Sequence, residues 1–342
     1  MSKVTERRKE EHITINLEQD VQFPNLTTGL ERYRFLHRAL PEINLSEVST
    51  AVSIFGKTLQ SPIFISSMTG GTERARKINR HLAAAAQEAG LAMGVGSQRA
   101  AIENGDLADT FHLRDVAPDI LLFANLGAVQ LNYKYGLDHC RRAVEMIGAD
   151  ALILHFNALQ EAVQPEGDTN FAGLMEKVAA ICQQIEVPVI AKEVGWGFSP
   201  ADIKLLAEAG VRAIDVAGSG GTSWSEVEYH RAPTAFHARV ARSFADWGIP
   251  TADAIRYVRE AAPQIPVFAS GGLRDGIDIA KSVALGATLA GMAGPFLKAA
   301  DQSVDDALEL IRITNAQLRV AMFCTGSRTL AELSQVQMLE PG

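Results

Sequence analysis

Residues 151–161 read Ala-Leu-Ile-Leu-His-Phe-Asn-Ala-Leu-Gln-Glu, an apolar run of strand character that turns polar at its end. Side chains two positions apart on a strand point to the same face, so His155 and Asn157 project together. Gln160 and Glu161 follow where a loop begins. Barrel enzymes collect their working groups at such carboxyl ends of strands. A capped strand end with satisfied polar groups is the alternative, but four polar groups of these types favour a site.

The same unit recurs along the chain, as short apolar runs separated mostly by segments of helical spacing. The runs are residues 62–66, 91–95, 120–125, 151–155, 187–192, 213–217, 266–270 and 288–293. The clearest helical segments between them are residues 78–89, 136–147, 171–185 and 200–209. Eight strand–helix units in succession predict a parallel sheet closed into a (βα)₈ (TIM) barrel of α/β class. A doubly wound open sheet is the structural alternative, but no reversal signal interrupts the units.

Two regions break this rhythm. Residues 1–60 carry no strand–helix unit and begin with a densely charged stretch, so they are expected to form an arm and a lid over one barrel end. Residues 61–342 then form the barrel domain. Residues 218–262 make an unusually long connection after the sixth strand. Barrels often place substrate covers in such loops.

The composition is that of a soluble protein with a sizeable core, with 47% hydrophobic and 21% charged residues among 342. The net charge of −8 argues against non-specific nucleic-acid binding. No apolar run approaches the ~20 residues that span a bilayer, and the amino terminus lacks the apolar segment of a secretion signal. Cys140, Cys182 and Cys324 show no metal-like spacing. Reduced thiols in a cytoplasmic protein are therefore expected.

Glycines follow the last two predicted strands, as Gly271-Gly272 after the seventh and Gly294 after the eighth. Glycine lets backbone N–H groups approach an anion, and a following helix N-terminus adds a favourable dipole. Tight turns are the alternative use of these glycines. Because barrels frequently bind a phosphate after strands seven and eight, the two together favour a phosphate site.

The other strand ends offer small hydroxyls, backbone amides, a carboxamide and one lysine. They include Ser66, Ser67, Thr69, Gly96, Ser97, Asn125, Gly127, Lys192, Gly221 and Thr222. Such a ring suits a flat heteroaromatic with many acceptors, such as an isoalloxazine. Lys192 would supply the countercharge to a reduced, anionic ring. Its alternative role is an ion pair with a neighbouring carboxylate, since Glu193 is adjacent.

These residues together resemble the type 2, FMN-dependent isopentenyl-diphosphate isomerase family, from the arm almost to the carboxyl end. The landmarks are residues 8–12 (RKEEH), 68–71 (MTGG), 94–99 (GVGSQR), 155–161 (HFNALQE), 192–195 (KEVG), 220–224 (GGTSW), 247–251 (WGIPT) and 270–274 (SGGLR). Ser67 departs from the pattern, because the family more often has alanine before Met-Thr-Gly-Gly.

The resemblance implies the interconversion of isopentenyl and dimethylallyl diphosphate in isoprenoid biosynthesis, with FMN, Mg²⁺, NADPH as reductant and a homotetramer or homo-octamer. It assigns FMN contacts to Ser67, Met68, Thr69, Ser97, Asn125, Lys192, Thr222, Gly271, Gly272, Ala293 and Gly294. It assigns the substrate to Arg8, Lys9, His12, Ser97, Gln98, Arg99, Asn157 and Gln160, with His155, Gln160 and Lys192 at the reaction and Glu161 as the metal ligand.

These assignments suit the chemistry. Arg8, Lys9, His12 and Arg99 can give charge-assisted hydrogen bonds to a diphosphate, although a charged terminus can also be a solvated tail. One carboxylate plus phosphate oxygens and water suffices for Mg²⁺. Because the reaction has no net redox change, we expect reduced FMN to act as the acid–base group at its N5 region. A radical route stays open.

Two rival functions remain at this stage. An FMN-dependent 2-hydroxy-acid oxidase or dehydrogenase would place a catalytic histidine after the sixth strand, where residues 217–222 contain none. A non-catalytic flavin-binding sensor barrel is the second rival.

Overall fold

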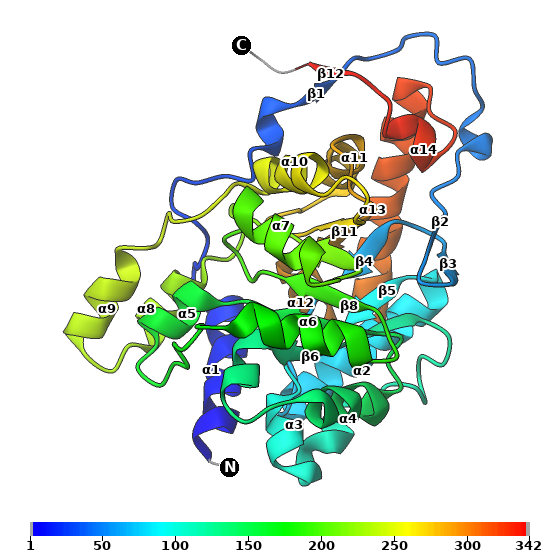
Figure 1. Ribbon diagram of the computed structural model, residues 1–342. Helices are drawn as coiled ribbons and strands as arrows, with labels where there is room; N and C mark the ends of the chain where they lie inside the picture. The colour runs from blue at the N-terminus through cyan, green and yellow to red at the C-terminus, as the bar shows by residue number, and fades with distance from the viewer. Residues whose placement is uncertain (1–2, 340–342) are drawn as a thin grey trace.

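Eight parallel strands close into a barrel in the computed structural model, which describes residues 3–339 (Figure 1). In chain order the strands are β4 (Ile63–Ile65), β5 (Ala92–Gly94), β6 (Leu121–Gly127), β7 (Ala151–His155), β8 (Val189–Lys192), β9 (Ala213–Asp215), β10 (Val267–Ala269) and β11 (Leu289–Met292). Seven of the predicted apolar runs each contain one of these strands, and β6 begins within the run 120–125 and continues two residues beyond it. Since β10 and β11 pair onward to β4, the sheet has no edge, and the predicted (βα)₈ barrel is confirmed.

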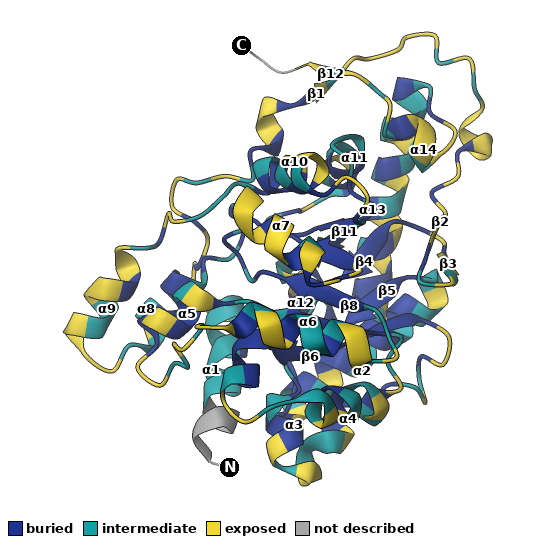
Figure 2. Cartoon of the chain, in the orientation of Figure 1, coloured by how far each residue is buried: buried dark blue, intermediate teal, exposed yellow. Residues whose placement is uncertain are grey.

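Helices surround the barrel with their buried faces inward, as the colours in Figure 2 show, and these faces carry mostly apolar side chains. The layer comprises α2 (Glu73–Ala89), α4 (Leu137–Ile147), α6 (Leu174–Gln184), α7 (Pro200–Glu208), α10 (Thr251–Ala261), α11 (Gly276–Ala284) and α13 (Val304–Thr325). Helix α2 shows how the sequence sets these bounds. The Thr72 hydroxyl accepts from the amide of Ala75 at its start, and Gly90 ends it in the left-handed region with φ 64°.

Shorter elements lie at the two ends of the barrel. They are the helices α3 (Arg99–Glu103), α5 (Ala158–Val163), α8 (Trp224–Arg231), α9 (Ala235–Arg242), α12 (Gly294–Gln302) and α14 (Leu330–Leu333), and the 3₁₀ helices η1 (Leu30–Arg32), η2 (Leu45–Glu47), η3 (Gly105–Phe111) and η4 (Ala128–Asn132). The long connection predicted after the sixth strand contains α8 and α9 and then the barrel helix α10.

A hairpin closes the amino-terminal end of the barrel. Its strands β2 (Val52–Ile54) and β3 (Lys57–Leu59) pack Ile54 and Leu59 against the barrel interior, which includes Phe123 and Phe268. Large side chains thus fill this end, so it is a packed core rather than a channel.

The first sixty residues therefore serve both ends, whereas a lid over one end was expected. Helix α1 (Lys3–Glu18) lies at the opposite, carboxyl end, where its residues line a cavity. Strand β1 (Arg34–Phe35) pairs with β12 (Met338–Leu339) outside the barrel. In the part of the chain that is described, no helix combines the length and apolar character needed to cross a membrane.

Strand register brings the predicted site residues level with one another. Gly127 pairs with His155 across β6 and β7, and His155 pairs with Lys192 across β7 and β8. Lys192 in turn pairs with Asp215 at the end of β9. A ring of polar side chains therefore stands at one height on the carboxyl rim.

Candidate active site

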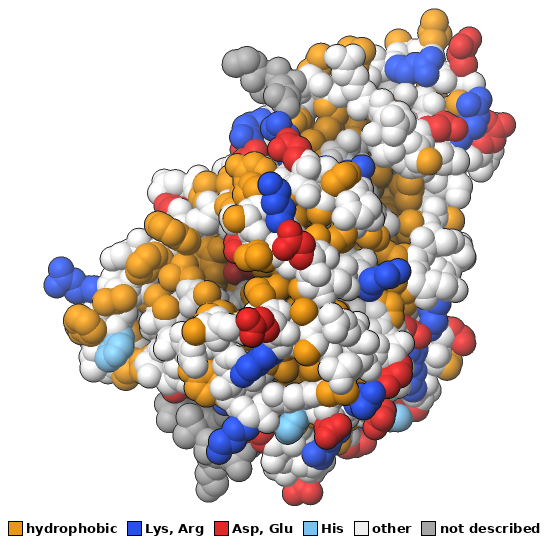
Figure 3. All heavy atoms as spheres, in the orientation of Figure 1, with side chains coloured by type: hydrophobic (Ala, Val, Ile, Leu, Met, Phe, Trp, Pro, Cys, Tyr) orange, Lys and Arg blue, Asp and Glu red, His pale blue; other side chains and the backbone are white. Residues whose placement is uncertain are grey.

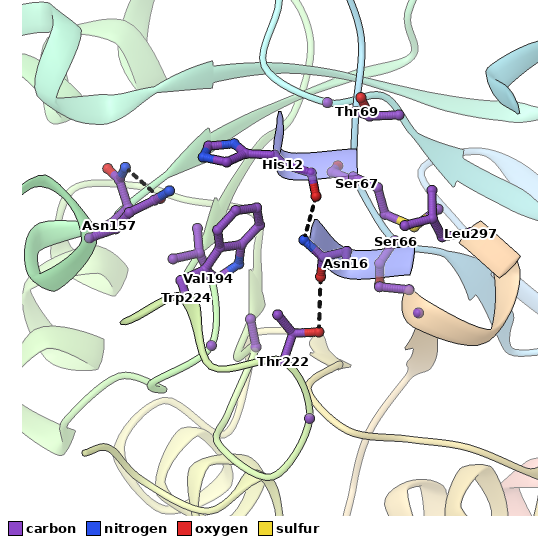
Figure 4. A pocket seen from close by; sticks show the side chains of 18 of the residues that line it. His12, Asn16, Ser66, Ser67, Thr69, Asn157, Val194, Thr222, Trp224 and Leu297 are labelled. Atoms are coloured by element: carbon purple, nitrogen blue, oxygen red, sulfur yellow. Dashed lines mark hydrogen bonds between the residues drawn. The ribbon is translucent and has the colours of Figure 1, made fainter. Parts of the chain in front are cut away.

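A cavity of about 800 Å³ opens at the carboxyl ends of the barrel strands, with α1 across its mouth (Figure 4). It takes in nearly all residues that the sequence assigned to FMN, substrate and metal. Its lining includes Arg8, Lys9, His12, Ser67, Met68, Thr69, Ser97, Arg99, Asn125, His155, Asn157, Gln160, Glu161, Lys192, Thr222, Gly271, Gly272, Ala293 and Gly294. Eight strand ends, two loops and the arm thus converge on one space.

Gln98 is the exception, and the structure does not bring it to the cavity. Its side chain is fully buried in the wall, where Nε2 donates to the carbonyl of Ala143 (2.8 Å) and Oε1 accepts from the amide of Asn125 (2.9 Å). Two buried backbone groups need these partners. Gln98 therefore fixes the position of Asn125 rather than contacting a ligand directly.

The corner after β10 and β11 has the features of a phosphate site. Gly271 and Gly272 have φ values of 104° and 77°, which L side chains rarely adopt. A side chain at Gly271 would also collide with the carbonyl oxygen of Gly218. Helix α12 begins at Gly294, with open space around that residue. Backbone amides and a helix N-terminus are thus available to an anion.

Two hydroxyls beside this corner have no partner among the described residues. Ser66 Oγ and Ser67 Oγ are both buried and unbonded, and both side chains line the cavity (Figure 4). Buried polar groups are normally hydrogen-bonded. These hydroxyls therefore fit a ligand that offers acceptors, as an isoalloxazine does.

Lys192 is buried at the end of β8 and carries the countercharge expected for such a ligand. Its Nζ donates to the carbonyl of Glu193 (2.9 Å) and lies 3.3 Å from Oδ2 of Asp215. Asp215 also accepts from Ser270 Oγ (2.6 Å). The ion pair is thus with Asp215, not with the Glu193 carboxylate considered from sequence. An ammonium has three donors, so one stays available to the cavity.

The Glu193 carboxylate has a different role. Its Oε2 accepts from four successive backbone amides, those of residues 194–197, at 2.5 to 3.2 Å. Burial nevertheless raises the pKa of Glu193 to about 7, against the opposing effect of these amides. Val194 and Gly195 of the clamped loop line the cavity. Glu193 therefore shapes the wall next to Lys192.

His155 is a neutral imidazole in this site. Burial first, and then the positive charges of Lys192 and Arg8, lower its pKa to about 3. Its Nδ1 is 2.7 Å from Asn125 Oδ1. A carboxamide oxygen only accepts, so Nδ1 carries the proton and the Nε2 lone pair is left for a ligand. His155 can accept a hydrogen bond but does not act as a cation near neutral pH.

Asn157, Gln160 and Glu161 form one polar group at the start of α5. Asn157 Nδ2 donates to Gln160 Oε1 (3.2 Å) and to Glu161 Oε1 (2.8 Å). Glu161 Oε2 accepts from Gln164 Nε2 (2.6 Å) and from the amide of Asp168 (2.7 Å). The carboxylate is thereby fixed in direction at the cavity wall.

This group fits a magnesium ion that is held mainly by substrate and water. No cluster of three His, Cys, Asp or Glu side chains with metal-binding geometry occurs among residues 3–339. Asn157 Oδ1, however, is buried without a partner beside Glu161. A carboxylate and a carboxamide oxygen suit a hard cation whose other ligands are phosphate and water oxygens.

Basic side chains from the arm and from the start of α3 line the same cavity. Lys9 Nζ donates to the carbonyl of Ser97 (2.8 Å) and lies over the ring of Phe111. Burial, and then the charge of Arg8, lower the pKa of Lys9 to about 7. Arg99 is held by Glu103 (2.9 Å) and Asp168 (2.6 Å), so its guanidinium is fixed before any ligand arrives.

The structure also places residues that the sequence reasoning did not single out for the site. Trp224 lines the cavity and forms a T-shaped ring contact with His12, at a centroid distance of 5.1 Å (Figure 4). Glu228 Oε1 lies 3.3 Å from His12 Nε2 and accepts from Gln160 Nε2 (3.1 Å). Asn16, four residues after His12, bonds Thr222 (3.4 Å). Because His12 and Asn16 are four residues apart on a helix, the sequence could have predicted that Asn16 also faces the site. No sequence pattern predicted Glu228.

The comparisons with known proteins point the same way. The chain matches the FMN-dependent dehydrogenase family over residues 1–109 and 141–340. Proteins described as isopentenyl-diphosphate delta-isomerase from Nostoc sp. and Synechocystis sp. are 55% and 54% identical to it over 336 and 334 residues, covering 98% of this chain and 96% of each relative. One from Rickettsia bellii is 52% identical over 332 residues, with 97% of both chains covered.

Solved structures support the fold alone. A mandelate oxidase variant with (S)-mandelic acid gives a TM-score of 0.71 at 20% identity, covering 98% of this chain and 97% of the other. A mandelate oxidase with (S)-2-phenylpropionate gives 0.69 with the same coverage and identity. Strand β9 here is followed by a glycine-rich loop without histidine. Residues 217–222 therefore lack the histidine that was expected directly after the sixth strand of a hydroxy-acid oxidase.

Proposed function

Because this chain belongs to the FMN-dependent dehydrogenase family and, within it, to the isopentenyl-diphosphate delta-isomerases, we propose that it interconverts isopentenyl and dimethylallyl diphosphate with bound FMN and Mg²⁺. One observation carries the proposal. A single cavity joins a lysine–serine–glycine set suited to a flavin with a cationic set suited to a diphosphate. The amide and carboxylate group of residues 157–161 stands between them.

The reaction moves a double bond by one position, so one carbon of the alkene gains a proton and another loses one. Reduced FMN, when bound, would supply the group that exchanges these protons. Lys192 would hold the flavin and offset negative charge at its pyrimidine edge, since it is buried and paired on one side by Asp215. The two unbonded serine hydroxyls and the glycine corner would bind the rest of the cofactor.

The protein's own side chains bind and orient the substrate. Arg8, Lys9, His12 and Arg99 would contact the diphosphate, with arginine offering bidentate geometry. Glu161 would hold Mg²⁺ against the same phosphate oxygens. Gln160 is oriented by Glu228 and can place its amide on the alkene.

His155 would help to orient the alkene but would not donate a proton to it. With a pKa of about 3 it does not carry a proton to donate near neutral pH, and its Nε2 lone pair can accept. The arm across the mouth limits access of water. A carbocation-like transition state needs such exclusion, because water would capture it.

The test is anaerobic incubation of the full-length protein with FMN, NADPH as reductant, Mg²⁺ and isopentenyl diphosphate, with NMR detection of dimethylallyl diphosphate. Product that requires both the flavin and the reductant is the expected result. No product from a flavin-loaded, reduced protein would reject the isomerase and favour a sensor barrel. Consumption of oxygen with 2-hydroxy acids would instead indicate an oxidase.

The proton-exchange role has its own test. A flavin analogue that keeps redox chemistry but lacks nitrogen at position 5 should bind without restoring turnover. Full activity with this analogue would reject acid–base chemistry at that position.

We further infer a cytoplasmic homotetramer or homo-octamer. Hydrophobic side chains gather over α8 and α9 in Figure 3, and Phe236 and Trp247 are 72% and 60% exposed. Exposed apolar patches commonly mark contacts between proteins. Light scattering of the purified protein tests the assembly, and a monomer would reject it.

A further inference from the structure

A buried arginine on α8 connects the arm to the rest of the mouth. The Arg231 side chain is only 9% exposed, and its guanidinium contacts three carboxylates from three parts of the chain. These are Glu11 of the arm (3.2 Å), Glu166 of the α5–α6 connection (3.0 Å) and Glu228 of its own helix. Glu228 also orients Gln160, whereas Arg231, Glu11 and Glu166 have no role in the proposed reaction.

The arm needs such a fastening because residues 8–12 offer no apolar side chain for packing. Residues 8–12 are all charged or polar, and the apolar Ile13 that follows them is 2% exposed. Helical propensity alone does not hold a short charged helix in water. The polar contacts of residues 8–12 must therefore keep this half of the helix in place.

Those contacts lie on two sides of the mouth. On the β5 side, Lys9 donates to the carbonyl of Ser97. On the α8 side, Glu11 and His12 reach Arg231 and Glu228. Figure 4 shows His12 of the arm beside Trp224, the first residue of α8, and Asn16 bonded to Thr222 just before this helix. Loss of the α8 side would remove the contacts of Glu11 with Arg231 and of His12 with Glu228.

The charge of Glu228 and the geometry of the guanidinium explain how one arginine can bind all three carboxylates on the α8 side. Burial alone would raise the pKa of Glu228, but the contact with His12 and the positive charge of Arg231 hold it below its usual value. Glu228 is therefore an anion, and Arg231 is its buried partner. Because the guanidinium has five donors in a fixed plane, it can hold Glu228 and still bind Glu11 and Glu166. A lysine cannot meet three carboxylates with the same geometry.

We propose that Arg231 is a positioning residue that fastens the arm helix α1 across the mouth of the cavity. It contacts no ligand in this scheme. It acts through Glu11 on the arm, which carries Arg8, Lys9 and His12, and through Glu228 on Gln160. The part of the inference that concerns substrate affinity rests on the proposed function, but the fastening of the arm does not.

The fastening is tested by limited trypsin digestion of the full-length, FMN-saturated protein without substrate. Cleavage after Arg8 or Lys9, followed by mass spectrometry, reports opening of the arm. Arg231→Gln should speed this cleavage about tenfold, the effect of losing one charge-assisted hydrogen bond. Glu11→Gln should speed it to a similar extent and leaves the buried Arg231–Glu228 pair intact. Glu11→Gln therefore decides the question even if Arg231→Gln fails to fold.

Two variants serve as matched controls. Arg242→Gln removes an arginine of α9 that is 53% exposed and pairs with Glu226 (3.0 Å), away from the arm. Glu166→Gln removes a carboxylate that contacts Arg231 but lies outside the arm. Both should show the unmodified protein's cleavage rate. Cleavage at that same rate in Arg231→Gln and Glu11→Gln would overturn the proposal.

Steady-state kinetics separate positioning from a general loss of structure. In Glu11→Gln the KM for isopentenyl diphosphate should rise about tenfold while kcat and flavin affinity are kept. Arg231→Lys should recover part of the arm protection lost in Arg231→Gln. A proportional loss of flavin affinity and kcat in Glu11→Gln, with KM unchanged, would reject the fastening role. An inactive but arm-protected protein would instead reject the proposed function and leave the fastening intact.

Discussion

The buried carboxylate of Glu193 makes a quantitative prediction about stability and pH. Its pKa is raised from the ordinary 4.5 to about 7 in the folded protein. Between these two values the folded state binds the proton more tightly than the unfolded chain does. The stabilisation is therefore complete below about pH 4.5 and is lost as the pH rises through about 7.

The size of the effect follows from that difference in pKa. At about 1.4 kcal/mol per pKa unit, ionising Glu193 lowers the free energy of unfolding by about 3 kcal/mol across this window. Glu193→Gln has no proton to lose, and its amide oxygen can still accept from the backbone amides of residues 194–197. The variant should thus gain about 3 kcal/mol relative to the unmodified protein between pH 4.5 and 8.

Urea unfolding of the FMN-free protein at a series of pH values measures this difference. Other carboxylates titrate in both proteins and cancel when the two curves are subtracted. Glu260→Gln, which removes a carboxylate that is 64% exposed, controls for the change in net charge. Parallel curves for Glu193→Gln and the unmodified protein would refute the reasoning. They would mean that the four amides outweigh burial and keep the carboxylate ionised.

Four further outcomes are expected in the assembled enzyme. Lys192→Ala should weaken FMN binding about tenfold, measured by fluorescence titration, and reduce kcat about 100-fold. Unchanged FMN affinity would reject the proposed contact between this lysine and the flavin. Glu161→Gln should raise the Mg²⁺ requirement about tenfold with FMN still bound, and an unaltered Mg²⁺ titration would contradict the metal role. Arg8→Ala should raise the KM for isopentenyl diphosphate about tenfold, and unchanged kinetics would make the arm a tail. The KM should also rise above about pH 7 as Lys9 loses its proton, and Lys9→Arg should flatten that profile.

The sequence was sufficient for the barrel because each strand–helix unit is specified locally. Apolar runs such as residues 151–155 are buried on both faces, and Gly90 and Gly148 end helices in the left-handed region that glycine favours. Parallel strands that each pair with the next in chain order satisfy one another fully when the last strand pairs with the first, as β11 does with β4. The polar strand ends therefore had to meet at one rim, and His155 and Lys192 do.

Tertiary structure alone decided which polar groups face the cavity and which hold the wall. Gln98 sits between Ser97 and Arg99, yet its side chain turns inward because the amide of Asn125 and the carbonyl of Ala143 need partners. Local periodicity does not contain that information, since both partners are at least 27 positions away.

The arm shows most clearly that local sequence does not specify distant partners. Its charged residues indicate an anion-binding segment when they are matched to a family, but nothing in residues 8–12 specifies a partner 220 positions later. Arg231 meets Glu11 only because the chain after β9 leaves the barrel and returns as α8 beside α1. Periodicity and turn chemistry act over a few residues and so fix strands and helices in the sequence. The partner of a buried charge comes from a distant segment of the chain. The contacts that hold the arm therefore become visible only in the folded structure.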